Sequence, residues 1–203
     1  MTYHPDEFQH PLDFITCGHA GPEPLFDRVT ADFLLQSHAE LKARLAAGSS
    51  LLEAVSLGPT VPWLWRLTFS TIGLALSATG EVVRCERHTV ALRFQPDCLR
   101  STNRFEMLRH LEPARPYHPN IGASGSHAEG AVCVEIYPGE PLIEIAISLH
   151  ELLRWRLRNY DHRDALNPAA CIYGRNHVHE PIDDRPLFCR RLAIRLEPLE
   201  AQP

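Results

Sequence analysis

Four short stretches that favour β-structure follow one another between residues 63 and 94, and they constrain the fold more than any other part of the chain. Aromatic and β-branched residues are frequent in them, and turn-prone positions such as Gly80 separate them. The stretches are residues 63–69, 73–77, 82–85 and 89–94. We expect them to form consecutive strands of an antiparallel sheet.

Helical patterns lie on both sides of this strand-rich region. Residues 25–47 predict a first helix that ends at Gly48, and a short helical turn is expected over residues 51–56. The apolar side of the first helix consists of Phe26, Val29, Phe33, Leu34, Leu41 and Leu45. Pro141 can open a second helix over residues 142–158. Helix, antiparallel sheet and helix together make an α+β sandwich.

The second helix is expected to be amphipathic and to pack on the sheet. Its apolar positions are Leu142, Ile145, Ile147, Leu149, Leu152 and Leu153. The charged residues expected on its wetter side are Glu144, Glu151, Arg154, Arg156 and Arg158. Beyond it, residues 166–173 predict a short helix with Cys171 in the core, and residues 187–199 alternate as a strand does.

Composition is that of a soluble globular protein with one domain and an extension. The 203 residues are 44% hydrophobic, and a net charge of −5 argues against a general nucleic-acid binder. The first 24 residues are polar and contain four prolines, which is unlike a secretory signal, and we expect no membrane span. The six cysteines show no CxxC pair, so we expect free thiols in a reducing cytosol and a cytoplasmic protein.

A thiol, an amide and a carboxylate occur in segments that one compact fold can bring together. Cys133 lies in an apolar run, where a cysteine is usually a small core residue. Asn120 follows His118 and Pro119, and the rigid proline presents its amide from an ordered turn. A preorganised amide donor is what the oxyanion of acyl transfer needs. Asp164 lies in the polar turn after the second helix.

These groups suit acyl transfer through a thioester. A cysteine is partly ionised at neutral pH, which suffices to accept an acyl group from another thioester. Transfer to an amine is harder, because an ammonium must lose a proton and an oxyanion must be stabilised. Asn120 is the candidate for the oxyanion and Asp164 for orienting and desolvating the amine. The alternatives are an amide that stabilises its own loop at Asn120 and a solvated carboxylate at Asp164.

In the order of these parts the chain resembles the ubiquitin-conjugating enzymes, the E2-type carriers of ubiquitin and ubiquitin-like proteins, from about residue 62 to 176. Residues 63–96 resemble that family's antiparallel meander, and residues 105–121 resemble its fourth strand leading into His-Pro-Asn. Cys133 then lies where the catalytic cysteine lies, and Asp164 matches the family's acidic gate residue one position before Ala165-Leu166.

The resemblance implies an α+β fold with an N-terminal helix, a four-stranded antiparallel meander, an active-site loop and a packing helix. It implies that Cys133 is catalytic, that Asn120 and Asp164 assist it, and that no metal or cofactor takes part. The partners it implies are a ubiquitin-like modifier, an E1-like activating enzyme and an unknown target, with no nucleic acid and no membrane. For a divergent bacterial member, the implied setting is a conjugation operon of antiviral defence with a JAB-type peptidase.

The chain also departs from the family. The spacer of residues 122–130 between Asn120 and Cys133 is longer than usual, which leaves open how the amide approaches the thiol. The Trp-x-Pro that commonly follows the active-site strand is absent. The divisions that we expect are an N-terminal arm (1–23), an E2-like catalytic domain (24–176) and a C-terminal extension (177–203).

Other polar residues are weaker candidates. His118, His127 and His162 could gather around Cys133, and one of them could ease its ionisation. The potential ligands near the C-terminus lack the spacing of zinc motifs and are expected at the surface: His177, His179, Glu180, Asp183 and Asp184. Lys42 is the one lysine among 20 basic residues. Either a GC-rich genome or protection of a thioester carrier from its own amines accounts for that bias.

Three functions remain open at this point. The favoured one is an E2-like carrier that forms a thioester between Cys133 and a modifier. The second is a non-catalytic E2 variant that binds ubiquitin-like proteins, which fits if the 122–130 spacer buries or misaligns Cys133. The third is an unrelated cysteine hydrolase or metal-binding module, which hydrolysis without ATP or bound metal would reveal.

Overall fold

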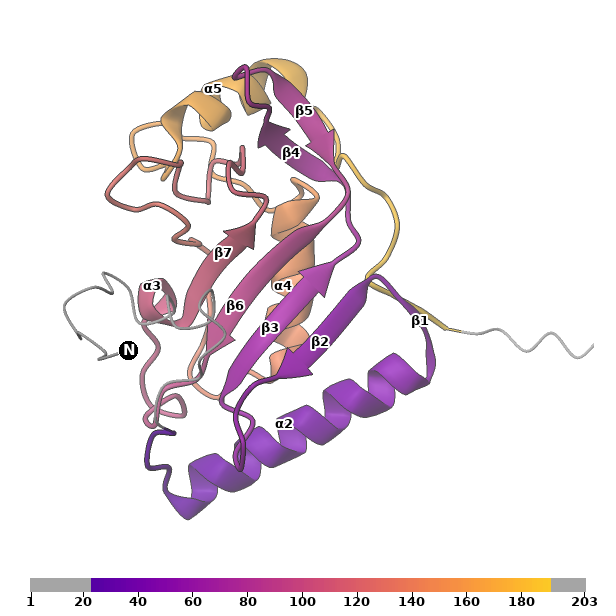
Figure 1. Cartoon of the computed structure of the whole chain (residues 1–203), viewed down its shortest axis with the longest axis vertical. Helices are drawn as coiled ribbons and strands as arrows, with labels where there is room; N and C mark the ends of the chain where they lie inside the picture. Colours follow the sequence, from indigo (N-terminus) through magenta and orange to yellow (C-terminus); the bar gives the residue numbers. More distant parts are fainter. Residues whose placement is uncertain (1–22, 191–203) are drawn as a thin grey trace, which may run out of the picture.

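The computed structural model describes residues 23–190. At its centre a four-stranded antiparallel sheet runs in the order β2-β3-β6-β7 (Figure 1). Its strands are β2 (Leu52–Ser56), β3 (Leu64–Phe69), β6 (His88–Arg93) and β7 (Leu108–Glu112). A helix precedes the sheet and another covers one of its faces, which confirms the α+β architecture predicted from the sequence.

Strand β2 corrects the helical turn expected over residues 51–56. It pairs with β3 in antiparallel register, with Leu52 opposite Phe69. Leu52 is buried and Glu53 is exposed, as the alternation of a strand requires. The pairing buries Leu52 in the core, and this tertiary gain outweighs the local helical preference.

Strands β4 (Gly73–Leu76) and β5 (Val82–Cys85) were predicted as strands, but not as a sheet of their own. They form a separate antiparallel hairpin, which comes between β3 and β6 in chain order. Gly73 lies where the chain leaves the main sheet, and a Cβ atom there would be 2.5 Å from Nε2 of His88. The absence of a side chain lets the two segments approach, and the hairpin extends beyond the end of the sheet (Figure 1).

Helix α2 (Arg28–Ala46) begins at Asp27, whose side chain accepts a hydrogen bond from the N–H of Thr30 at 2.7 Å. Leu34 and Leu41 are buried in the core, as their place in the predicted apolar side required. The expected helix over residues 25–47 is therefore confirmed, three residues shorter at its start and one at its end.

Val29 was expected on that apolar side and is exposed instead. In the first turn of α2 it is Thr30 that faces inward, where its hydroxyl donates to the carbonyl oxygen of Pro96 at 3.4 Å. Thr30 thus takes the inward position, where its hydroxyl satisfies a backbone carbonyl.

Helix α4 (Leu142–Leu153) lies across one face of the sheet (Figure 1). Pro141 precedes it, and the N–H of Leu142 donates to Oγ of Ser37 in α2 at 2.7 Å. The side chains that α4 buries against the sheet include Leu142, Ile145, Leu149, Leu152 and Leu153. This contact joins both helices to one apolar core.

The expected continuation of this helix to residue 158 is wrong, because α4 ends at Leu153. Trp155 adopts a left-handed backbone conformation with φ of 69°, which stops the helix. Arg154 was expected on the wetter side and is buried; its Nη1 donates to the carbonyl oxygen of Arg185 at 3.1 Å. A returning C-terminal segment therefore covers this end of α4.

The remaining elements lie around the ends of the sheet. Helix α3 (Arg104–Met107) leads into β7, and α5 (Pro168–His177) lies near the β4–β5 hairpin (Figure 1). The expected helix over 166–173 is thus present, shifted by two residues at its start. Strand β8 (Phe188–Arg190) pairs with β1 (Gly48–Ser50), and the rest of the strand expected over 187–199 lies outside the described residues. Among residues 23–190, no helix is long and apolar enough to cross a membrane.

Candidate functional site

Cys133 and Asn120 lie opposite each other on two short antiparallel segments. The N–H of Cys133 donates to the carbonyl oxygen of Asn120 at 2.8 Å, and Ile121 forms a β-bridge with Val132. Cys133 is half-buried and unbonded to any other cysteine, and its thiol has no hydrogen-bond partner among the described residues. The thiol is therefore neither sealed in the core nor occupied by a partner within this part of the chain.

The long spacer of residues 122–130 closes on itself. The N–H of Gly130 donates to the carbonyl oxygen of Gly122 at 3.2 Å, and Gly122 donates to that of Ala131 at 2.9 Å. A Cβ atom on Gly122 would overlap the carbonyl of Ala128, so this closure needs glycine there. The loop projects from a closed base, and its extra length does not separate Asn120 from the backbone of Cys133.

The side chain of Asn120 bridges two backbone segments. Its Nδ2 donates to the carbonyl oxygen of Cys133 at 2.8 Å, and its Oδ1 accepts the N–H of Asn159 at 2.7 Å. A carboxamide carries two N–H donors, and within residues 23–190 one of the two on Asn120 is used. The amide thus holds the backbone at Cys133 and keeps one donor for a further acceptor.

The loop that carries Asp164 is anchored at both ends to the His118-Pro119-Asn120 segment. Asn159 donates its N–H to Asn120, and Asn167 donates its N–H to the carbonyl oxygen of Pro119 at 3.2 Å. Asn167 also caps α5, because its Oδ1 accepts the N–H of Ala170 at 3.1 Å. Asp164 lies between these anchors with its side chain exposed.

An ion pair lies in the loop that carries Asp164. Arg163 donates from Nη2 to Asp161 at 2.6 Å and from Nε at 3.0 Å, in a two-pronged ion pair. These bonds hold the pKa of Asp161 at about 2. Asp161 is therefore paired with Arg163, whereas the nearby Asp164 is exposed.

The three histidines expected around Cys133 differ from one another in burial. His118 is buried, its Nδ1 accepts the N–H of Asn120 at 3.1 Å, and its ring contacts that of Trp155 at 4.8 Å between centroids. Burial, with His88 and Arg158 adding to it, lowers the pKa of His118 to about 3. Because its Nδ1 already accepts the N–H of Asn120, His118 orients Asn120. His127 and His162 are exposed.

Two further buried histidines, both in the sheet, were not singled out from the sequence. His88 and His110 lie on the inner face of the sheet, with Nδ1 of His88 3.4 Å from Nε2 of His110. Burial lowers the pKa of His88 to about 4 and that of His110 well below its ordinary range. The alternation of β7 was a signal that could have found His110.

No protein-family model matches the chain, and no curated protein matches it. Among solved structures it is similar to human ubiquitin-conjugating enzyme E2 G1, with 19% identity, a TM-score of 0.40 and coverage of 64% of this chain and 98% of that one. It is also similar to ubiquitin conjugating enzyme E2 UbcA1 from Agrocybe aegerita, with 14% identity, a TM-score of 0.44 and coverage of 77% and 100%. These likenesses concern the arrangement of the elements and not activity.

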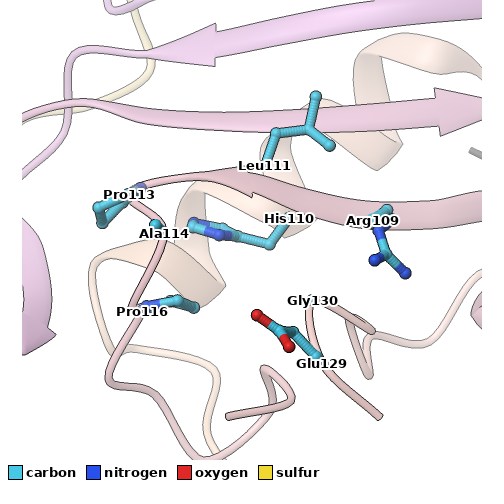
Figure 2. A pocket seen from close by; sticks show the side chains of 8 residues that line it. All are labelled: Arg109, His110, Leu111, Pro113, Ala114, Pro116, Glu129 and Gly130. Carbon is cyan, nitrogen blue, oxygen red and sulfur yellow. The ribbon is translucent and has the colours of Figure 1, made fainter. Parts of the chain in front are cut away.

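A cavity of about 240 Å³ lies beside β7 and the base of the 122–130 loop (Figure 2). Its lining consists of Arg109, His110, Leu111, Pro113, Ala114, Pro116, Glu129 and Gly130. Figure 2 shows the Glu129 side chain directed into this space, and its oxygens accept hydrogen bonds from Ser124 and Gly125 of the same loop. The cavity includes none of the three predicted site residues, and Glu129 serves to hold the loop.

The C-terminal residues considered as metal ligands differ in their exposure to solvent. His179, Glu180 and Asp184 are exposed, as expected, but Asp183 is buried. Its Oδ2 accepts the N–H of Ile72 at 2.8 Å and pairs with Arg185. Across residues 23–190, no group of three or more potential ligand side chains is placed to hold a metal ion.

Proposed function

We propose that this protein is an E2-like carrier: it receives a ubiquitin-like modifier on Cys133 and transfers it to an amine. The supporting observation is the Asn120 side chain, which joins the backbone of Cys133 to the loop that carries Asp164. The proposal is supported because the segments that carry Cys133, Asn120 and Asp164 are bonded to one another. The partners are a ubiquitin-like modifier and an E1-like activating enzyme, in a bacterial conjugation operon of antiviral defence.

The first step is exchange between thioesters. The Cys133 thiolate attacks the carbonyl carbon of the modifier's thioester on the activating enzyme, a bond to Cys133 Sγ forms, and the other thiolate leaves. The half-buried position of Cys133 and the lack of a bonded partner within the described residues suit this attack. No strong base is needed, because one thiolate replaces another.

The second step is aminolysis. The target amine attacks the thioester carbonyl, the carbon–nitrogen bond forms, the amine loses a proton to solvent and Cys133 leaves as thiolate. Asp164 attracts and orients the ammonium form and eases the loss of its proton. The remaining N–H of Asn120 is a donor for the oxyanion, while the other fixes the Cys133 carbonyl.

The second candidate function is a non-catalytic module of the same fold that binds ubiquitin-like proteins. It required that the long spacer bury or misalign Cys133. The closed base of the 122–130 loop and the half-buried thiol favour the carrier over this alternative.

The test is to incubate the protein with ATP, the E1-like enzyme and the modifier encoded beside it. Gels run with and without reductant would compare the wild type with Cys133→Ala and with Cys85→Ala, a half-exposed free cysteine of β5. The carrier proposal expects a reductant-sensitive adduct that Cys133→Ala loses and Cys85→Ala retains. No such adduct with active partners would overturn it and favour the binding module.

A further inference from the structure

Trp155 has a backbone conformation that its residue type disfavours. Among the described residues it is the one non-glycine with positive φ, at 69°, and its side chain is 1% exposed. In this region the Cβ atom crowds the backbone, so glycine or asparagine is normally found there. A strained aromatic residue persists only where its surroundings over-determine it.

The conformation itself ends α4. The N–H of Arg156 donates to the carbonyl oxygen of Glu151 and the N–H of Trp155 donates to that of Leu152, both at 2.9 Å. This pair of bonds is the Schellman ending, in which glycine usually occupies the position of Trp155. Glycine would satisfy the same bonds without strain, so the backbone alone does not account for tryptophan.

The contacts of the indole ring explain why tryptophan occupies this position. The indole packs edge-on against the buried His118, with 4.8 Å between ring centroids. On another side it meets α5 at Gly174, where a Cβ atom would be 2.4 Å from ring atom Cζ3. The ring therefore fills the space between α5 and His118, and α5 leaves room for it by having glycine there.

The chain just after Trp155 is held as firmly. Arg158 donates from Nη1 to the carbonyl oxygen of Trp155 at 2.9 Å and from Nη2 to that of Val178 at 2.8 Å. One residue later, Asn159 bonds the side chain of Asn120. Trp155 is thus the fixed point from which the loop with Asp164 starts.

We infer that Trp155 is a positioning residue for the transfer step. It holds the ring of His118, whose Nδ1 accepts the N–H of Asn120, and it sets the start of the Asp164 loop. Trp155 touches neither the thioester nor the amine and acts through these groups. The inference rests on the proposed function, because transfer is the step that uses Asn120 and Asp164.

The consequence is a split between the two steps. Loading of Cys133 requires an accessible thiol, whereas aminolysis requires the amide and the carboxylate in place. Loss of the Trp155 ring should slow discharge of the thioester to a free amine at least tenfold and change loading less than twofold.

The experiment compares Trp155→Leu, Trp155→Phe and Trp63→Leu in the full chain. Trp63 is the matched control, because both tryptophans are buried and neither Nε1 has a hydrogen-bond partner among the described residues. Trp155→Leu should slow discharge, Trp63→Leu should not, and Trp155→Phe should restore most of the rate because no indole hydrogen bond is lost. Equal effects of the two leucine variants on discharge, or wild-type discharge in Trp155→Leu, would overturn the inference.

A second variant leaves Trp155 in place. Gly174→Ala puts a methyl group against the ring, while alanine favours the helix more than glycine does. It should slow discharge, and because the methyl group overpacks the site, the melting temperature is measured beside the rate to show that the variant stays folded. Unchanged discharge would contradict the inference even if Trp155→Leu fails to fold.

An NMR readout separates this inference from the proposed function. In ¹⁵N-labelled protein, the Asn120 side-chain amide and the Asn159 backbone N–H should shift in Gly174→Ala and stay in place in Trp63→Leu. If wild-type protein fails to load, the proposed function falls, and these shifts still decide whether Trp155 positions Asn120. Unshifted resonances in Gly174→Ala would overturn the positioning role itself.

Discussion

Asn120 and Cys133 are joined twice. The N–H of Cys133 donates to the carbonyl oxygen of Asn120 at 2.8 Å, and Nδ2 of Asn120 returns a bond to the carbonyl oxygen of Cys133 at 2.8 Å. The same side chain accepts the N–H of Asn159. One asparagine therefore sets the backbone of the candidate nucleophile and the position of the loop beside it.

Replacing Asn120 with alanine should lower the free energy of unfolding by about 1–3 kcal/mol, because two bonds are lost and the N–H of Asn159 is left without its acceptor. Urea denaturation would measure the change. Asn103→Ala is the control and should change stability by about 0.5 kcal/mol or less, since within residues 23–190 the exposed Asn103 amide bonds only to Glu106. Equal stability of the two variants would contradict the bridging role of Asn120.

Replacing Asp164 with alanine should leave stability unchanged, because its side chain is exposed. Discharge of the Cys133 thioester to a free amine should slow by about tenfold or more, since the ammonium is no longer oriented or helped to lose its proton. The defect should shrink as pH rises and the amine deprotonates unaided. A single-turnover discharge assay, with the exposed Asp32→Ala as control, would reject the role if both variants match the wild type.

Local patterns were sufficient for elements that carry their own signal. The strand expected over residues 63–69 differs from β3 by one residue, and that over 82–85 matches β5, because aromatic and β-branched runs bounded by turns mark strands directly. How Asn120 approaches Cys133 stayed open, because the closure of the spacer depends on contacts between Gly122 and Gly130 that no pattern displays.

Three features required the tertiary structure. Strand β2 exists because β3 offers a partner, and its own residues predicted a helical turn. The early end of α4 depends on Trp155, whose left-handed backbone no propensity would suggest. Asp183 was expected at the surface, because the sequence does not show its two partners. Ile72 is remote in the chain, and Arg185 reaches Asp183 only because the backbone bends between them.

Asp183→Asn should destabilise the protein by roughly 2 kcal/mol, since hydrogen bonds to charged groups contribute about 1.5–3 kcal/mol each. Burial opposes ionisation of Asp183, but bonds from Arg185 and from the N–H of Ile72 outweigh it and hold its pKa well below the usual range. Thermal unfolding at pH 7 would show the loss. The adjacent, exposed Asp184→Asn is the control, and equal melting temperatures would show that the Asp183 bonds contribute nothing.

Arg163→Lys should create a site of self-modification. Arg163 is exposed and adjacent to Asp164, and a lysine amine there would compete with targets for the thioester, whereas a guanidinium stays protonated. Mass spectrometry after charging should find the modifier on residue 163. Arg28→Lys, at the exposed start of α2, is the control and should remain unmodified. An unmodified Lys at both positions would favour genome composition as the reason for the single natural lysine.

The buried histidines should make the fold acid-sensitive between pH 6.5 and 5. The folded protein holds the pKa of His88 at about 4 and that of His118 at about 3, mainly through burial, whereas an unfolded histidine titrates near 6.5. As pH falls below 6.5, these histidines are protonated in the unfolded chain but stay neutral in the folded protein. The free energy of unfolding therefore falls by roughly 2 kcal/mol per histidine at pH 5. The carboxylates with lowered pKa, such as Asp161, lose their contribution to stability only below this window.

Urea unfolding at pH 7 and pH 5 would test this. The difference in the free energy of unfolding between the two pH values should be smaller in His88→Gln than in wild type, and unchanged in the exposed His179→Gln. If wild-type stability is the same at both pH values, the histidines are not neutral in the fold.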